Sequence, residues 1–134
     1  MSIAGLRNRG VPMPRRWEIW EVRLDATSEG REQAGTRPCV VISRDAFNLS
    51  GLETVVVCPM TTIEREKFVW RPRVDAADLT PIAAQWSAKP SWVQTDQVVT
   101  LDVRRRAHRH LATVSNSERR TEIEARLREI LGLD

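Results

Sequence analysis

Three polar residues stand beside apolar, strand-like runs, at places where a side chain could act on a phosphate group. The first is Arg37, which joins a polar loop to Pro38, and proline stiffens the backbone at that point. A guanidinium held there offers fixed, planar donors to phosphate oxygens. The alternative is an ion pair with a loop carboxylate such as Glu32.

Thr61 and Asp96 are the other two. Thr61 is followed by Thr62 and ends an apolar run over residues 54–60. Its hydroxyl could face solvent, bind a phosphate or cap a turn. Asp96 interrupts an apolar-leaning run, and a carboxylate in such a run must be hydrogen-bonded, exposed or functional. The residue types favour chemistry at a phosphate and leave the reaction open.

Several familiar catalytic motifs are absent from the sequence: Gly-x-Ser-x-Gly, His-Glu-x-x-His, Gly-x-x-x-x-Gly-Lys and Gly-x-Gly-x-x-Gly. His108 and His110 are too close to act as acid and base on opposite sides of a phosphate, and no third ligand type accompanies them. We therefore expect neither a metal nor a cofactor. Cys39 and Cys58 lie in apolar runs, which predicts buried, reduced thiols.

The net charge of +3 comes from an unusual set of residues, because all but two of the 21 basic side chains are arginines. Arginine binds phosphate bidentately and stacks on bases, so this composition favours an anionic partner, although a GC-rich genome has the same effect. The segments 7–16, 71–73 and 104–109 could supply one basic face if the fold brings them together.

The chain of 134 residues has the length of one domain, and 41% of its residues are hydrophobic, enough for one core. Residues 1–15 lack a hydrophobic period and are expected to be a flexible lead-in to a single domain over 16–134. No apolar run reaches the roughly twenty residues of a membrane span, and no secretion signal is evident. We expect a soluble, cytoplasmic protein.

The apolar pattern predicts a mostly β fold, a small bent sheet or barrel with one C-terminal helix. The alternation changes phase between Ile19 and Trp20, which indicates a bulge or two covered faces. Short strands are predicted over residues 17–24, 38–43, 54–60, 67–74, 91–99 and 111–114. The predicted connections are a long polar loop over 25–37, helical or plain turns over 44–50 and 101–108, and an irregular stretch over 75–90 with room for a short helix or strand.

The C-terminal helix carries its own start and stop signals. Ser115 with Glu118 fits a capping box, and Gly132 stands where a C-terminal cap is wanted. Between them one apolar stripe recurs at helical spacing, so the helix is expected to pack on the sheet or on a partner. The stripe consists of Ile123, Leu127, Ile130 and Leu131.

Four segments taken together resemble the MazF/PemK family of toxins: residues 18–25, 32–43, 57–62 and 96–98. The Glu-Gln-x-Gly-x-Arg-Pro stretch that begins at Glu32 is the specific part. The resemblance implies an SH3-like, CcdB-like barrel of bent antiparallel strands, a homodimer, and a toxin of a type II toxin–antitoxin system. It also implies an acidic, MazE-like antitoxin, for which Trp70 or Trp86 would be apolar docking points.

The activity implied is metal-independent, sequence-selective cleavage of single-stranded RNA, in which the 2′-hydroxyl attacks the adjacent phosphate and leaves 2′,3′-cyclic phosphate and 5′-hydroxyl ends. Arg37 matches the family's catalytic arginine and Thr61 its threonine. Glu32 and Asp96 match carboxylates implicated in some members, which leaves the general acid and base open. The implied RNA-binding residues are Arg31, Thr36, Thr62, Arg65, Lys67 and Gln97.

The chain departs from the family pattern at three positions. Trp17 replaces a frequent glycine, Arg23 replaces a residue that is more often acidic or small, and Gln94 stands where some members place a second catalytic arginine. Two alternatives to a ribonuclease remain open. Relatives that poison gyrase share this fold and act by binding alone, and a catalytically silent RNA-binding protein would also fit.

Overall fold

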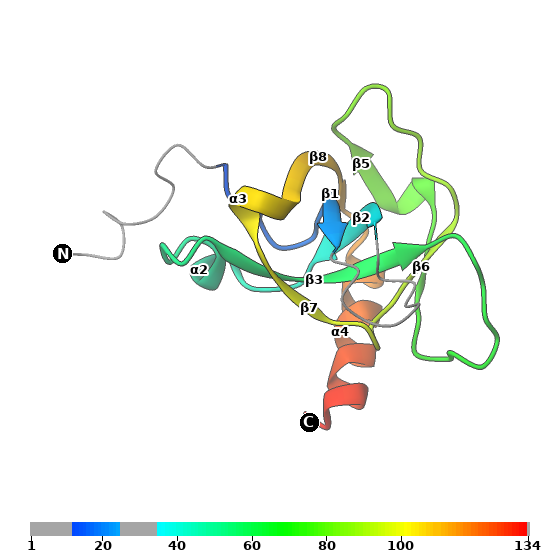
Figure 1. Cartoon of the computed structure of the whole chain (residues 1–134). Coiled ribbons are helices and arrows are strands. Elements are labelled where there is room, and N and C mark those ends of the chain that lie inside the picture. Colours follow the sequence, from blue (N-terminus) through cyan, green and yellow to red (C-terminus); the bar gives the residue numbers. More distant parts are fainter. Residues whose placement is uncertain (1–11, 25–34, 134) are drawn as a thin grey trace.

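The computed structural model describes residues 12–24 and 35–133. It shows a curled sheet with one long helix at the C-terminal end (Figure 1). Predictions that concern Glu32 and Arg31 lie outside the described residues. In chain order the elements are β1 (Glu18–Leu24), β2 (Gly35–Val41), α2 (Asp45–Asn48), β3 (Thr54–Thr61), β4 (Arg73–Val74), the 3₁₀ helix η1 (Ala76–Asp78), β5 (Leu79–Pro81), β6 (Ser91–Val93), β7 (Val99–Asp102), α3 (Val103–Arg106), β8 (Ala107–Val114) and α4 (Ser117–Leu131).

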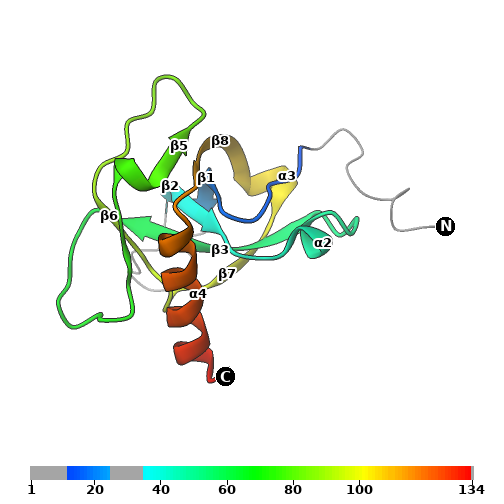
Figure 2. The same ribbon diagram turned by 180° about the vertical axis from the view of Figure 1, so that it is seen from behind.

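The described strands form one antiparallel sheet in the order β4-β6-β3-β2-β1-β8-β5, and β7 also pairs with β3. The sheet curls into a half-barrel, with α4 against it, as both views show (Figures 1 and 2). The register of β1 against β8 shifts between Ile19 and Trp20, so the predicted bulge is confirmed. The predicted fold class, a small bent β sheet with a C-terminal helix, is confirmed as well.

The core consists of two apolar clusters on opposite faces of β1 and β2. Ile19 and Val40 belong to one cluster, while their chain neighbours Trp20 and Cys39 belong to the other. This alternation is what the two-residue period of a strand dictates when both faces of the sheet are covered. The first cluster also receives Ile123 of α4, which fixes that helix on one face.

The two cysteines are buried and free, as predicted. Cys39 and Cys58 lie in different clusters, and the register pairs Cys58 with Val40 rather than with Cys39. Burial raises the pKa of the Cys58 thiol to about 12 and raises that of Cys39 even more strongly. Both thiols therefore stay protonated at neutral pH.

The predicted strand over residues 67–74 is wrong for most of its length, because only Arg73–Val74 forms a strand. The preceding residues turn twice: the Phe68 amide donates to the Arg65 carbonyl, and the Arg71 amide donates to the Phe68 carbonyl. Arg71 is buried here, and Pro72 has no N–H to donate to a neighbouring strand. A strand could not continue through this pair.

The predicted strand over residues 91–99 is divided into β6 and β7 by a turn. β6 pairs with the end of β3 at Met60 and Thr61, whereas β7 pairs with the first half of β3. The chain turns between the two pairings, and the Gln97 amide donates to the Gln94 carbonyl at 2.9 Å. We call residues 94–98 the 94–98 turn. Asp96 lies in this turn and not in a strand.

The remaining connections follow the sequence more closely. The helical turn predicted within 101–108 is α3, and the irregular stretch 75–90 contains η1 and β5. The last strand is longer than the predicted 111–114, because β8 pairs with β1 from Ala107 onwards. Its other neighbour, β5, pairs only with the last three residues, 112–114.

The start of α4 differs from the prediction by one residue. Asn116, not Ser115, is the N-cap, and its side chain accepts a hydrogen bond from the Glu118 amide. Ser115 is held instead by η1, because its amide donates to the Asp78 carbonyl at 3.0 Å. At the other end Gly132 adopts the predicted left-handed cap, with φ of 69°.

Trp17 occupies a backbone conformation that explains why the family often has glycine there. Its φ is 75°, in the left-handed region. Its amide donates to the Val41 carbonyl and its carbonyl accepts from the Val114 amide, both at 2.8 Å, so it ties together the ends of β2 and β8. The ring is buried in the core, at the opposite end of β2 from Arg37.

Candidate functional site

Arg37 and Thr61 lie at the same end of two neighbouring strands. In the ladder between β2 and β3, Cys39 is opposite Pro59, Val40 is opposite Cys58, and Val41 is opposite Val57. This ladder ends at the pair of Cys39 and Pro59. Arg37 and Thr61 each lie two residues beyond it, so both stand at the same end of the two strands. Both side chains are half-buried. The two residues, which were predicted separately, are therefore candidates for one shared site.

Gln94 approaches this site from the other side of β3. Its backbone amide donates to the Pro59 carbonyl at 2.8 Å. Its side-chain Oε1 accepts a hydrogen bond from Arg37 Nη1 at 3.2 Å. The site thus draws on β2, on the end of β3 and on the 94–98 turn.

Asp96 is held by a buried arginine. Arg71 donates two hydrogen bonds to it, from Nε at 2.7 Å and from Nη2 at 2.9 Å, and Gln97 Nε2 donates a third at 3.2 Å. The Arg71 guanidinium also lies 3.9 Å from the centre of the Phe68 ring. The hydrogen bond from Arg71 is the main cause that lowers the pKa of the Asp96 carboxyl. Asp96 is therefore ionised at neutral pH and accepts hydrogen bonds there.

Thr61 ends β3, and its Oγ1 accepts a hydrogen bond from the Ile63 amide at 3.2 Å. The turn-capping role that the sequence leaves open is thus observed. The hydroxyl proton is not used by that bond and can be donated to a phosphate oxygen.

The candidate RNA-binding residues lie in two places. Thr36, in β2, precedes Arg37 and is exposed. Thr62, Arg65 and Lys67 are exposed in the connection that follows Thr61. Gln97 is half-buried and bonded to Asp96, while Arg31 and Glu32 lie outside the described residues.

The arginine segments do not combine into one uniformly unpaired basic face in the described part of the chain. Most of these side chains meet a carboxylate, and the two shortest pairs are those of Arg71 with Asp96 and of Arg104 with Glu53. The other pairs in these segments are Arg15–Asp45, Arg16–Glu124, Arg73–Asp75, Arg105–Asp102 and Arg109–Glu21. Arg65 and Lys67, in the connection that follows Thr61, make no ion pair with a described residue.

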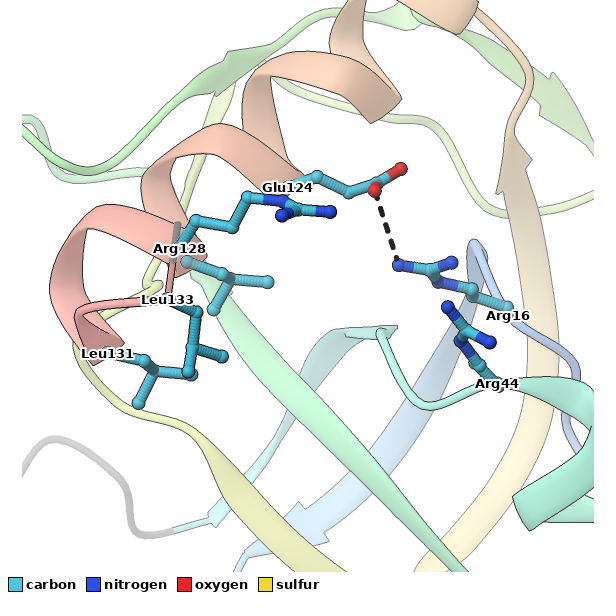
Figure 3. A pocket seen from close by; sticks show the side chains of 7 residues that line it. Arg16, Arg44, Glu124, Arg128, Leu131 and Leu133 are labelled. Carbon is cyan, nitrogen blue, oxygen red and sulfur yellow. Dashed lines mark ion pairs between the residues drawn. The ribbon is translucent and has the colours of Figure 1, made fainter.

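Among the hollows of the described residues, two lie near the site and at the far end of β2. One lies beside the site and is lined by Trp70, Asp96, Glu129 and Ile130. The other lies at the far end of β2, between α4 and the segments around Arg16 and Arg44 (Figure 3). In that second hollow, Arg16 Nη2 lies 3.8 Å from Glu124 Oε2, and leucines form the apolar wall.

Metal-ligating side chains do not cluster in the described residues, where no group of three or more His, Cys, Asp or Glu residues could hold a metal ion. His110 stacks on Trp20 with 5.6 Å between ring centroids, and its Nε2 lies 2.9 Å from the Ala112 carbonyl oxygen. His108 is exposed. Among the described helices, none is long and apolar enough to cross a membrane.

The half-barrel with its C-terminal helix has the fold of MazF toxins. The Mycobacterium tuberculosis toxin MazF-mt6 matches with a TM-score of 0.65 at 21% identity, over 87% of this chain and 98% of that one. MazF from Deinococcus radiodurans matches with a TM-score of 0.65 at 22% identity, over 90% and 98%. An endoribonuclease in complex with its cognate antitoxin, from a mycobacterial species, matches with a TM-score of 0.61 at 20% identity, over 90% and 97%.

The family model for PemK-like, MazF-like toxins of type II toxin–antitoxin systems matches residues 15–131. The chain belongs to this family, as the sequence motifs predict. A MazE–MazF complex from Deinococcus radiodurans has the same fold, with a TM-score of 0.64 at 21% identity over 92% of this chain and 100% of that one. Comparison with curated protein sequences gives no match.

Two residues of the site have no clear signal in the sequence. Gln94 is marked there only as a departure from the family pattern, and Arg71 only as one more basic residue. Their roles depend on partners that are distant in the chain, Arg37 for Gln94 and Asp96 for Arg71. The one weak hint in the sequence is that Arg71 stands beside a proline in a segment with aromatic residues. Because cations stack on aromatic rings, such an arginine can be held in place.

Proposed function

We propose that this protein is a toxin that cleaves single-stranded messenger RNA in the cytoplasm without a metal ion, and that it cuts selectively at a sequence motif. The observation that carries the proposal is the arrangement at one end of the half-barrel: Arg37 of β2 and Thr61 of β3 lie at the same end of two paired strands, and Gln94 is hydrogen-bonded both to Arg37 and to the Pro59 carbonyl of β3. Membership of the MazF-like toxins supports the same reaction.

In the proposed reaction the ribose 2′-oxygen attacks the adjacent phosphorus, and the bond from phosphorus to the 5′-oxygen breaks. The 2′-hydroxyl proton passes to a base, and the leaving 5′-oxygen takes a proton. The products are a 2′,3′-cyclic phosphate and a 5′-hydroxyl. Arg37 donates to the phosphate oxygens, whose negative charge grows in the transition state, and Thr61 donates its hydroxyl to the same group.

The base and the acid of this reaction are proposed from the two carboxylates of the site. Asp96 is ionised and so can accept a proton or a hydrogen bond, but its low pKa makes it a poor proton donor at neutral pH. Glu32, in the loop that precedes β2, is the second candidate. Thr36, Thr62, Arg65, Lys67, Gln97 and Arg31 are proposed to bind the RNA.

The proposed partners are a second copy of the chain and a cognate acidic antitoxin. Solved relatives include an endoribonuclease with its cognate antitoxin. The hollow that Trp70 and Ile130 form beside Asp96 would take the apolar side chains of such a peptide and so let it cover the site. Trp86 lies in a separate hollow on the β5 side. An antitoxin that covers Asp96 would compete with RNA.

The experiment that tests the function is incubation of the purified protein with a mixed-sequence single-stranded RNA in EDTA, followed by analysis of the ends. We expect cleavage with 2′,3′-cyclic phosphate and 5′-hydroxyl ends, because the nucleophile belongs to the substrate. Intact RNA that is nevertheless bound would favour a silent RNA-binding protein. Intact RNA without binding would contradict the proposal, and inhibition of gyrase would then be measured.

Thr61→Val is expected to lower kcat for RNA cleavage by roughly 10- to 100-fold, because valine keeps the branched shape but loses the donor to the phosphate. The melting temperature should change little. Thr54→Val is the matched control, since Thr54 stands at the other end of the same strand. Equal activity of the two variants would remove Thr61 from the mechanism.

A further inference from the structure

Gln94 is a buried amide whose side chain is directed at the proposed catalytic arginine. It is 1% exposed and is among the largest side chains that the described residues bury completely. A buried amide needs hydrogen-bonding partners, since its desolvation otherwise costs free energy. Gln94 Oε1 meets that need by accepting from Arg37 Nη1 at 3.2 Å.

The backbone around Gln94 is fixed on both sides. Its amide donates to the Pro59 carbonyl at 2.8 Å, which ties it to β3 just before Thr61. Its carbonyl accepts from the Gln97 amide at 2.9 Å, and the Thr95 hydroxyl donates to the Trp70 carbonyl at 2.6 Å. The acceptor that holds Arg37 is therefore itself held by the sheet.

The acceptor is neutral, and this matters for a group that must bind an anion. A guanidinium has five N–H donors, and the bond to Gln94 uses one of them. A carboxylate in the same place would pair with Arg37 and cancel the charge that a phosphate needs. An amide fixes the orientation and leaves both the charge and the other donors available.

We propose that Gln94 is a positioning residue that holds the Arg37 guanidinium toward the scissile phosphate, an inference that rests on the proposed function. Gln94 stands where some family members have a second catalytic arginine. In this chain a neutral side chain at that position would orient Arg37 instead. Misplacing a catalytic group by about 1 Å can cost two orders of magnitude in rate. The role of Gln94 should therefore show in kcat.

The first test compares Gln94→Met and Gln94→Glu by steady-state cleavage of a single-stranded RNA. Gln94→Met keeps the length and removes the acceptor, and we expect kcat to fall roughly tenfold with KM nearly unchanged. Gln94→Glu keeps an acceptor but pairs with Arg37, and we expect KM to rise roughly tenfold and to depend less on salt. Gln85→Met, on an exposed surface, is the control.

The second test asks whether Gln94 acts through Arg37. In the Arg37→Ala background, Gln94→Met should change the residual rate less than twofold, because the group that it positions is gone. A merely structural role would give the same loss in both backgrounds, together with a lower melting temperature. That result would overturn the inference.

A third measurement does not depend on cleavage. Nitrogen NMR of the arginine side chains, with Arg37 assigned by its absence in Arg37→Ala, reports rotation of the guanidinium. Slow rotation in the wild type and fast rotation in Gln94→Met would support the positioning role of Gln94. This result would hold even if the protein cleaved no RNA, since a failed cleavage assay refutes only the proposed function. Equally fast rotation in both proteins would overturn the inference.

Discussion

Arg37→Ala is expected to reduce kcat for RNA cleavage by about 100- to 1000-fold, the range typical for loss of one fixed donor to a developing anion. Binding should weaken less than catalysis, because Arg37 is one of several cations near the path of the RNA. Arg37→Lys keeps the charge but loses the planar fork, so it should restore only part of the rate. The measurement is single-turnover cleavage at saturating protein.

The matched control for this prediction is Arg44→Ala. Arg44 is exposed and lies just beyond the other end of β2, in the hollow of Figure 3. Its loss changes the net charge by the same amount as the loss of Arg37. Similar rates for the two variants would mean that Arg37 contributes charge alone, and the proposed mechanism would fail.

Asp96→Ala is expected to lower the free energy of unfolding by about 3 kcal/mol, because it leaves the buried Arg71 guanidinium without its carboxylate partner. The Arg71 side chain is only 4% exposed, and Asp96 supplies two of its hydrogen bonds. Denaturant unfolding measures the effect. Arg104→Ala, which breaks the exposed pair with Glu53, should have a smaller effect.

The contribution of Asp96 depends on pH in a defined direction. Arg71 holds the folded-state pKa of Asp96 below the unfolded value of about 4. The ion pair therefore contributes its full stabilisation at pH values above the unfolded-state pKa of Asp96. This contribution is lost as the pH falls through the lower, folded-state pKa. The difference in unfolding free energy between wild type and Asp96→Ala should shrink only below about pH 4. A difference that stays constant into acid would contradict the ion pair.

The strands that flank the site were predictable because each has a strong local pattern. The phase change at Ile19 and Trp20 marks a bulge that the ladder with β8 contains. The β-branched run before Pro59 gives β3, and Thr61 follows from where that run ends. Local alternation and propensity were enough for the centres of these strands, whereas the first residues of β2 and β8 lie in segments that were predicted as connections.

The 67–74 and 91–99 segments could not be predicted, because distant partners decide their conformation. The alternation of residues 68–73 favours a strand, but Trp70 is 44% exposed and Arg71 is buried. The partner that buries Arg71 is Asp96, 25 residues away. Likewise, Ser115 fits a capping box locally, but its amide is already bonded to Asp78.

The placement of the two cysteines keeps them from forming a disulfide with each other in the folded domain. Cys39 and Cys58 point to opposite faces of the sheet, a geometry that a disulfide cannot span without moving the backbone. Their thiols are protonated and shielded from solvent, so they are also poor nucleophiles. Neither cysteine should therefore be modified by a thiol reagent while the domain stays folded.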